Sequence, residues 1–229
     1  MDQDGHINRN IVLLGNTGAG KSTLVNHIIG REELKVHSSI AGVTRSALVM
    51  PPVTAQARGY KFTFKLIDTA GVYDRSNQEI ISDIKRCFKQ EIQSINLILF
   101  VFKDGRFTSE DKKTFEMIIK SINERMSDIS ALVVTNCDQK GHVARKRIVD
   151  DIHATAEKIA DFVKKGIYTV GFPNLSEIDE DLRSMYEQSI KKDECEIRDL
   201  VSQCKKEVST DGGMSEHFWT SLCAKCPLL

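Results

Sequence analysis

Eight consecutive residues near the start of the chain form the pattern with the clearest chemistry. They read Gly15-Asn16-Thr17-Gly18-Ala19-Gly20-Lys21-Ser22 and fit G-x-x-x-x-G-K-[ST], the phosphate-binding loop. Glycines let successive backbone N–H groups face one anion, and the helix expected at 22–29 adds its positive N-terminal end. We expect Lys21 to reach the outer phosphates, Ser22 to bind Mg²⁺ and Thr23 to join the phosphate site. The pattern predicts a nucleoside triphosphate as ligand; the alternative is a glycine-rich turn that binds nothing.

A second polar segment, Asp68-Thr69-Ala70-Gly71, ends a strand expected at 60–67, 46 residues after Ser22. In phosphate-loop proteins an Asp at this place holds Mg²⁺, usually through water, and the Gly71 N–H can approach the γ-phosphate. Thr44 lies between Ser22 and Asp68 and has the hydroxyl needed to bind Mg²⁺ and the γ-phosphate. Ser22, Thr44 and Asp68 are therefore the predicted metal ligands, although Asp and Gly are also common in simple strand-end turns.

A third segment, Thr135-Asn136-Cys137-Asp138, follows a buried strand expected at 131–134 and is suited to reading a base. The Asp138 carboxylate can accept the N1–H and the exocyclic amino group of guanine, a pair of donors that adenine does not offer. A site built for such a pair rejects the ligand that leaves its acceptor unpaired. The segment predicts guanine recognition, and the alternative is an Asp that caps a helix.

The rest of the chain alternates between strand-like and helix-like segments. Continuous apolar runs at 97–102 and 131–134 are typical of strands covered on both faces of a parallel sheet. Further strands are expected at 11–14, near 46–53, at 60–67 and at 167–170, with helices at 80–92, 115–126 and 148–166 and mostly from 175 onward. In strand 60–67 the outward residues should be Lys61, Thr63 and Lys65. This order predicts an α/β fold with a doubly wound, mostly parallel sheet and helices on both faces.

Composition narrows the class of protein. Lys+Arg and Asp+Glu both number 32 in 229 residues, so no net charge favours nucleic acid or an anionic membrane. The N-terminus carries no apolar signal-peptide core, and no apolar run approaches the ~18 residues of a membrane span. We therefore expect a cytoplasmic protein without a nucleic-acid partner that keeps its six cysteines reduced.

One longer segment resembles a known family. It reads Leu97-Ile98-Leu99-Phe100-Val101-Phe102-Lys103-Asp104-Gly105-Arg106-Phe107-Thr108-Ser109-Glu110-Asp111 and is similar to the signature box of the GIMAP family. These are the immunity-associated GTPases, related to septins and to the chloroplast import receptor GTPases. The resemblance covers roughly residues 8 to 200. It implies the P-loop GTPase fold, GTP and GDP as ligands, Mg²⁺, and a homodimer or homo-oligomer across the nucleotide face.

The resemblance also bears on single residues. It implies that Asn174, in Gly171-Phe172-Pro173-Asn174, lies near the base, whereas Pro-Asn is also an ordinary turn dipeptide. Ala70 stands where the family usually has Pro, and Asn136 where it often has Arg, Lys or His. Because Asn136 stacks less well on a base, we expect a modest nucleotide affinity.

Hydrolysis depends on residues near the γ-phosphate. Val72 follows the Asp-Thr-Ala-Gly segment, where Ras-like GTPases have the Gln that orients the attacking water, so a monomer should hydrolyse GTP slowly. Arg106 and Thr44 are the predicted catalytic residues, and Arg106 is expected to act in trans on the partner's nucleotide. The alternative for Arg106 is a solvated or helix-capping surface arginine. Arg45 and Arg75 are secondary candidates.

Two classes of function remain open at this point. One is a GTPase switch activated by self-association, and the other is a GTP-dependent oligomerising scaffold with negligible hydrolysis. An ATP-using enzyme is opposed by Asp138 and by the box.

The expected organisation is a flexible N-terminus at 1–8, a GTP-binding domain at 9–175, a solvated helix packed on it at 176–207 and a flexible tail at 208–229. Cys226-Pro227-Leu228-Leu229 fits a prenylation motif, the one route by which we expect membrane association. Cys223 and Cys226 could instead be half of a zinc site with His217 or Cys204. A plain flexible tail, or a natural chain that continues, is the third interpretation.

Overall fold

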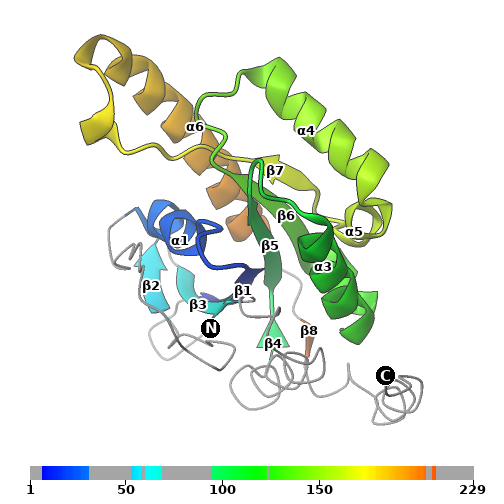
Figure 1. The fold of residues 1–229 in the computed structure, drawn as a ribbon. Coiled ribbons are helices and arrows are strands. Elements are labelled where there is room, and N and C mark those ends of the chain that lie inside the picture. Colours follow the sequence, from blue (N-terminus) through cyan, green and yellow to red (C-terminus); the bar gives the residue numbers. More distant parts are fainter. Residues whose placement is uncertain are drawn as a thin grey trace.

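The computed structural model describes residues 7–30, 53–57, 60–68, 94–122, 124–204 and 208–209. Its centre is a six-stranded sheet with the strand order β2-β3-β1-β5-β6-β7 (Figure 1). All neighbouring strands are parallel except β2, which runs antiparallel to β3. The strands are β1 (Ile7–Gly15), β2 (Val53–Ala57), β3 (Tyr60–Asp68), β5 (Leu97–Lys103), β6 (Ser130–Thr135) and β7 (Ile167–Thr169).

Helices cover both faces of this sheet, which confirms the predicted α/β fold. Side chains on one face of the sheet pack against the helices α3 (Ser109–Ser121), α4 (His142–Thr155) and α5 (Glu157–Phe162). Side chains on the other face pack against α1 (Lys21–Ile29) and α6 (Glu180–Gln203). The sheet therefore separates two hydrophobic cores, and alternate residues of each strand contribute to one or the other.

The middle of the sheet positions the site. β5 lies between β1 and β6, and its residues 97–102 are all buried, as expected for a central parallel strand. Gly15 at the end of β1 pairs with Asp68 at the end of β3, and Lys103 of β5 with Thr135 of β6. Because these strands are parallel, the segments that follow them gather at one edge of the sheet.

Two details of the sheet differ from the sequence-based expectation. The edge strand expected near 46–53 is Val53–Ala57 instead, and 46–52 lie outside the described residues. Lys65, expected to face solvent, is only 5% exposed. The reason is its place in the sheet: β3 lies between β2 and β1, and the sheet is covered on both faces, so the strand is not half-buried along its length.

Helix boundaries were also predicted imperfectly. The apolar face expected at 115–126 is split, because α3 ends at Ser121 and Met126 lies on a 3-10 helix, Glu124–Ile129. The single helix expected at 148–166 is two helices, which meet at Ala156 with φ −142° and ψ 44°. Ile152 and Ile159, on either side of this break, are both buried. Their seven-residue spacing equals two helical turns, so apolar periodicity alone does not reveal the break.

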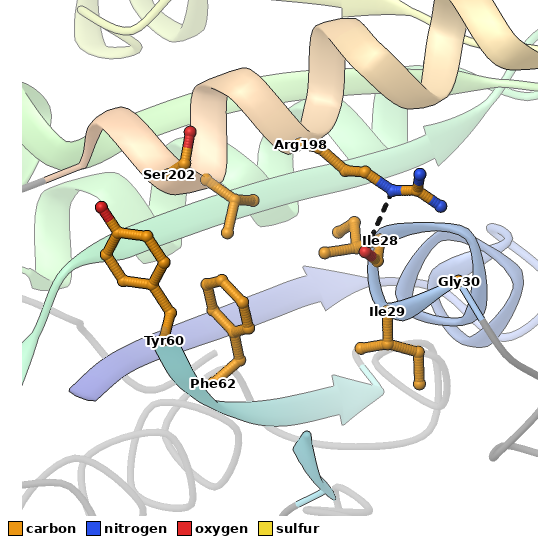
Figure 2. Close-up of a pocket in the computed structure, with 8 residues that line it drawn as sticks. Ile28, Ile29, Gly30, Tyr60, Phe62, Arg198 and Ser202 are labelled. Carbon is orange, nitrogen blue, oxygen red and sulfur yellow. Dashed lines mark hydrogen bonds between the residues drawn. The ribbon is translucent and has the colours of Figure 1, made fainter. Parts of the chain in front are cut away.

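The long helix α6 lies against α1 and β3. Arg198 donates through Nε to the carbonyl oxygen of Ile28 at 3.2 Å (Figure 2). Its Nη2 donates to the carbonyl oxygen of His27 at 2.6 Å. An apolar pocket of about 140 Å³ lies between α1, β3 and α6, at the C-terminal end of α1 and away from the phosphate loop. Within the described residues, no helix is both long and apolar enough to cross a membrane.

The described chain continues past α6 into a small second sheet. Val208–Ser209 forms β8, which pairs antiparallel with β4 (Ser94–Ile95), and Val208 is buried. The tail expected to be flexible from residue 208 therefore begins with two residues of strand. A 3-10 helix, Leu175–Glu177, precedes α6, and the remainder of the expected tail, 210–229, lies outside the described residues.

Candidate nucleotide site

The predicted phosphate loop connects β1 to α1, as its sequence pattern requires. Gly20 is the N-cap of α1 with φ 88°, a left-handed conformation that costs little only for glycine, and no side chain caps the helix there. The first-turn amides of an α-helix have no acceptor within the helix itself. The start of α1 therefore presents N–H donors and the positive end of the helix dipole toward the loop.

Lys21 adds a fixed positive charge to this loop. Its ammonium donates to the carbonyl oxygens of Gly15 at 2.6 Å and Asn16 at 2.9 Å, and the residue is 7% exposed. These bonds hold the ammonium beside the loop backbone that is expected to surround the phosphates. Ser22 and Thr23 follow in the first turn of α1. The donor set fits a polyphosphate, since it joins backbone amides to a cation and places a hydroxyl residue beside them.

The residues predicted to hold Mg²⁺ are only partly described. The backbone of Asp68 lies at the end of β3, directly beside Gly15, so the chain delivers this residue to the phosphate loop. Ser22 lies in the first turn of α1, the helix that follows the loop. A hydroxyl and a carboxylate supply the hard oxygen ligands that Mg²⁺ prefers. Thr44, Gly71, Val72, Arg45 and Arg75 lie outside the described residues, so their predicted roles stay predictions.

The predicted base-reading segment lies directly against the phosphate loop. The hydroxyl of Thr135 donates to the carbonyl oxygen of Ala19 at 2.8 Å, and its side chain approaches Gly20. Asn136 is exposed and has φ 63°, a conformation that Asn tolerates better than most residues. Asp138 is partly exposed, and within the described part of the chain no hydrogen bond to its carboxylate is present. Its acceptor oxygens are thus available to a ligand.

Two charged residues, one partly buried and one fully buried, support this segment and were missed in the sequence. Arg145 at the start of α4 and Asp193 on α6 form an ion pair, with 2.7 Å between Nη1 and Oδ1. Burial lowers the pKa of Arg145, but the hydrogen bond and the charge of Asp193 outweigh burial and raise it above its usual value. α6 was expected to be a solvated, charged helix, yet Asp193 is 1% exposed. The sequence signal that could have indicated its burial is its position, because Asp193 lies on the same helix face as the apolar residues Ile190, Ile197 and Leu200.

Asn174 is occupied locally. Its side chain caps the 3-10 helix Leu175–Glu177, accepting from the Ser176 N–H at 3.2 Å and donating to Glu177 Oε1 at 2.8 Å. This is the turn role that Pro-Asn also indicated. Its placement near a base stays a prediction.

The box that carries the family resemblance lies beside the phosphate loop. A cavity of about 240 Å³ is lined by loop residues 16–19 and by Arg106, Thr108 and Asp111. Arg106 is exposed, and its backbone N–H donates to the carbonyl oxygen of Lys103. Thr108 and Asp111 form a reciprocal capping box at the start of α3, and Asp111 also accepts a hydrogen bond from the Asn16 side chain. This link between box and loop was not anticipated.

The described cysteines are reduced thiols. Cys137, Cys195 and Cys204 are free, and burial raises the pKa of the Cys137 thiol to about 11, with a further contribution from Asp104. Burial likewise raises the pKa of Cys204, which lies in the core between α6 and the sheet. Among the described residues no three His, Cys, Asp or Glu side chains form a metal cluster. His217, Cys223 and Cys226 lie outside the described residues.

A single family model covers the loop, the base segment and the box of this chain. The family model described as AIG1 matches residues 9–175. The chain belongs to the AIG1 family. This membership confirms the family resemblance carried by the box, and the matched range contains each candidate nucleotide-site residue that the sequence indicated, from Gly15 to Asn174.

Curated relatives of this AIG1-family chain are bacterial GTPases. GTPase Der of a Thermotoga species is 29% identical over 201 residues, which cover 84% of this chain and 39% of that protein. GTPase Der of Clostridium kluyveri is 34% identical over 113 residues, covering 48% of this chain and 24% of that protein. The chain thus spans well under half the length of these relatives.

Solved structures confirm the fold. Toc33 from Arabidopsis thaliana superposes with a TM-score of 0.58 at 22% identity, covering 90% of this chain and 89% of Toc33. A second Toc33 structure, in complex with GDP and Mg²⁺, gives the same TM-score at 21% identity and covers 91% of this chain and 90% of Toc33.

Proposed function

We propose that this AIG1-family chain binds guanine nucleotides with Mg²⁺ and hydrolyses GTP to GDP. The observation that carries the proposal is the bond from Thr135 to Ala19, which holds the base-reading segment against the phosphate loop. A phosphate site and a base site are thereby joined at one edge of the sheet. The names of the relatives support this, since Der proteins are GTPases and Toc33 has been crystallised with GDP and Mg²⁺ and with GMPPNP.

Each part of the site has its own task. The amides of the loop and Lys21 bind the phosphates, while Asp138 accepts the guanine donors. Ser22 and Asp68, with Thr44, would hold Mg²⁺, which neutralises charge on the β- and γ-phosphates when it is bound. The chain's own contribution is to fix donors where negative charge accumulates.

The base assignment is tested by Asp138→Asn. Asn presents both a donor and an acceptor, so the variant should lose roughly a hundredfold in GDP affinity and prefer the xanthine nucleotide. Calorimetry with GDP, XDP and ADP measures this. Asp179→Asn, the same change at an exposed residue before α6, is the matched control and should bind all three nucleotides as the unchanged protein does. Equal affinity of the unchanged protein for GTP and ATP would contradict guanine recognition.

The finer proposal is that GTP drives self-association and that Arg106 acts in trans on the partner's nucleotide. Arg106 is exposed and lines the cavity beside the phosphate loop, which supports a contact with a second copy. Two Toc33 structures support this indirectly. One was described with the finding that dimerization is important for the GTPase activity of atToc33 and psToc159, and the other is of an arginine-to-alanine variant that is dimerization deficient.

The switch is distinguished from the scaffold alternative by measuring GTP turnover at a series of protein concentrations. Val72 favours the scaffold, because its apolar side chain cannot orient the attacking water. In the switch, turnover per protomer rises with protein concentration, and Arg106→Ala lowers it by at least tenfold while leaving GTP binding intact. Arg147→Ala, at an exposed position of α4, is the control. Turnover that is independent of concentration and of Arg106, with nucleotide-dependent oligomers in sedimentation, would favour the scaffold. A cytoplasmic location completes the proposal, and the C-terminus is the one route by which membrane contact would arise.

A further inference from the structure

The guanidinium of Arg145 uses all five of its donors. Its Nε donates to the carbonyl oxygen of Lys140, and its two Nη atoms donate to those of Thr169 and Cys137 at 2.8 and 3.0 Å. The two remaining donors form a bidentate pair with Asp193 at 2.7 and 3.0 Å. Arg145 therefore fixes the backbone on both sides of Asp138 and ties it to β7 and to α6.

Asp193 holds a second segment at the same time. Its Oδ2 also accepts the backbone N–H of Gly171 at 2.8 Å. Gly171 lies against the backbone of Asp138 so closely that a Cβ at this position would overlap the Asp138 N and Cα atoms. The N–H of Cys137 donates to the carbonyl oxygen of Val170, which completes the contact between the two segments.

We propose that Asp193 is a positioning residue for guanine selectivity. It acts through Arg145, which holds the backbone before and after Asp138, and through Gly171, which packs against Asp138, so that α6 fixes the direction of the base-reading carboxylate. Hydrogen bonds weaken steeply when their geometry is lost, and two donors on one base edge demand a fixed carboxylate. This inference rests on the proposed role of Asp138 as the guanine acceptor.

The docking of α6 does not depend on Asp193 alone. Glu194 pairs with His27 Nδ1 at 2.7 Å, and Arg198 donates to the His27 carbonyl oxygen. The His27 ring also stacks on Phe172, with 3.9 Å between ring centroids. These contacts, together with the apolar residues of α6 in the core, anchor the helix to α1. A change at Asp193 should therefore loosen the base segment while α6 stays in place.

The test compares the affinities of GDP and inosine diphosphate, which lacks the 2-amino group of guanine. For Asp193→Asn we expect the GDP affinity to fall about tenfold and the ratio of GDP to IDP affinity to fall about threefold, because inosine keeps the N1–H that Asp138 also accepts. Asp199→Asn, the same change at an exposed position of the same helix, should leave the ratio unchanged. Titrations are performed on protein shown to be folded by circular dichroism.

A second variant keeps the test decisive if Asp193→Asn fails to fold. Arg145→Lys retains a charge for Asp193 but cannot reach three carbonyl oxygens at once, so it should lower the same ratio.

A variant that melts at lower temperature yet keeps the full GDP to IDP ratio would show a structural role only and overturn the inference. If Asp138→Asn itself leaves base preference unchanged, the proposed function fails. If Asp138→Asn changes preference but Asp193→Asn and Arg145→Lys do not, only the present inference fails.

Discussion

The phosphate end and the base end of the site are built in different ways. The phosphate end is a single contiguous segment, residues 15–23, in which Lys21 donates to the carbonyl oxygens of Gly15 and Asn16 a few residues away. At the base end, Asp138 depends on distant parts of the chain, because its segment is held by Arg145 and, through it, by Asp193. Thr135 joins the two ends through Ala19.

This difference follows from what each end must recognise. A phosphate accepts hydrogen bonds from many directions, so a short loop with a helix N-terminus is sufficient and any nucleotide satisfies it. A base is recognised by two donors on one edge, so a carboxylate must be held in direction as well as in position. Selectivity therefore needs long-range support, whereas phosphate affinity does not.

The largest effect is expected from Lys21→Ala at the phosphate end. Loss of the ammonium removes charge-assisted hydrogen bonds to the phosphates, so GTP affinity should fall about a thousandfold. The loss should be the same for guanine and inosine nucleotides, because the role proposed for Lys21 involves only the phosphates. Isothermal titration with both nucleotides measures this, with Lys113→Ala at an exposed position of α3 as control. If Lys21→Ala lost affinity only for guanine nucleotides, phosphate binding and base selectivity would not be separate properties of the two ends.

A smaller effect, on stability, is expected from Gly171→Ala at the base end. The added Cβ overlaps the backbone of Asp138, and backbone cannot move aside as a flexible side chain would, so we expect about 2–3 kcal/mol of destabilisation. Gly141→Ala is the control because a Cβ there meets no atom within 4 Å, and its cost should stay under about 1 kcal/mol. Urea denaturation measures both. Equal losses would show that the close contact between 171 and 138 does not constrain the fold.

The same division explains how much the sequence predicted. The phosphate loop, the buried strands and the helix after Gly20 follow from local patterns, and the structure places them as expected. Local patterns also predicted the order of the described strands and helices and hence the fold, whereas the helix expected at 80–92 lies outside the described residues. They were less accurate where neighbouring strands decide burial, as at Lys65, or where a helix breaks without a change of period, as at Ala156.

The supporting residues of the base end could not be found in the same way. Arg145 and Asp193 are 48 residues apart, and neither belongs to a motif. Only the place of Asp193 in an apolar stripe of α6 sets it apart, and a charge in such a stripe does not identify its partner. The bond between Asn16 and Asp111 is similar, since both residues were noted for their own motifs and their contact depends on the fold.

The smallest effect concerns Cys137, which is buried directly beside Asp138. Burial and the nearby Asp104 raise the pKa of its thiol from 9.0 to about 11, so the folded state binds this proton more tightly than the unfolded state. The stabilisation is complete below pH 9 and is lost as the pH rises toward 11. Between pH 8 and pH 10, the free energy of unfolding of the wild type should fall by about 1 kcal/mol more than that of Cys137→Ala, in which this titration is absent. Urea denaturation at both pH values measures the difference, and Cys195→Ala, at an exposed thiol of α6, should behave as wild type. An identical pH dependence in the wild type and Cys137→Ala would mean that the thiol is hydrated, and that the base end is more open than the contacts around Arg145 and Gly171 indicate.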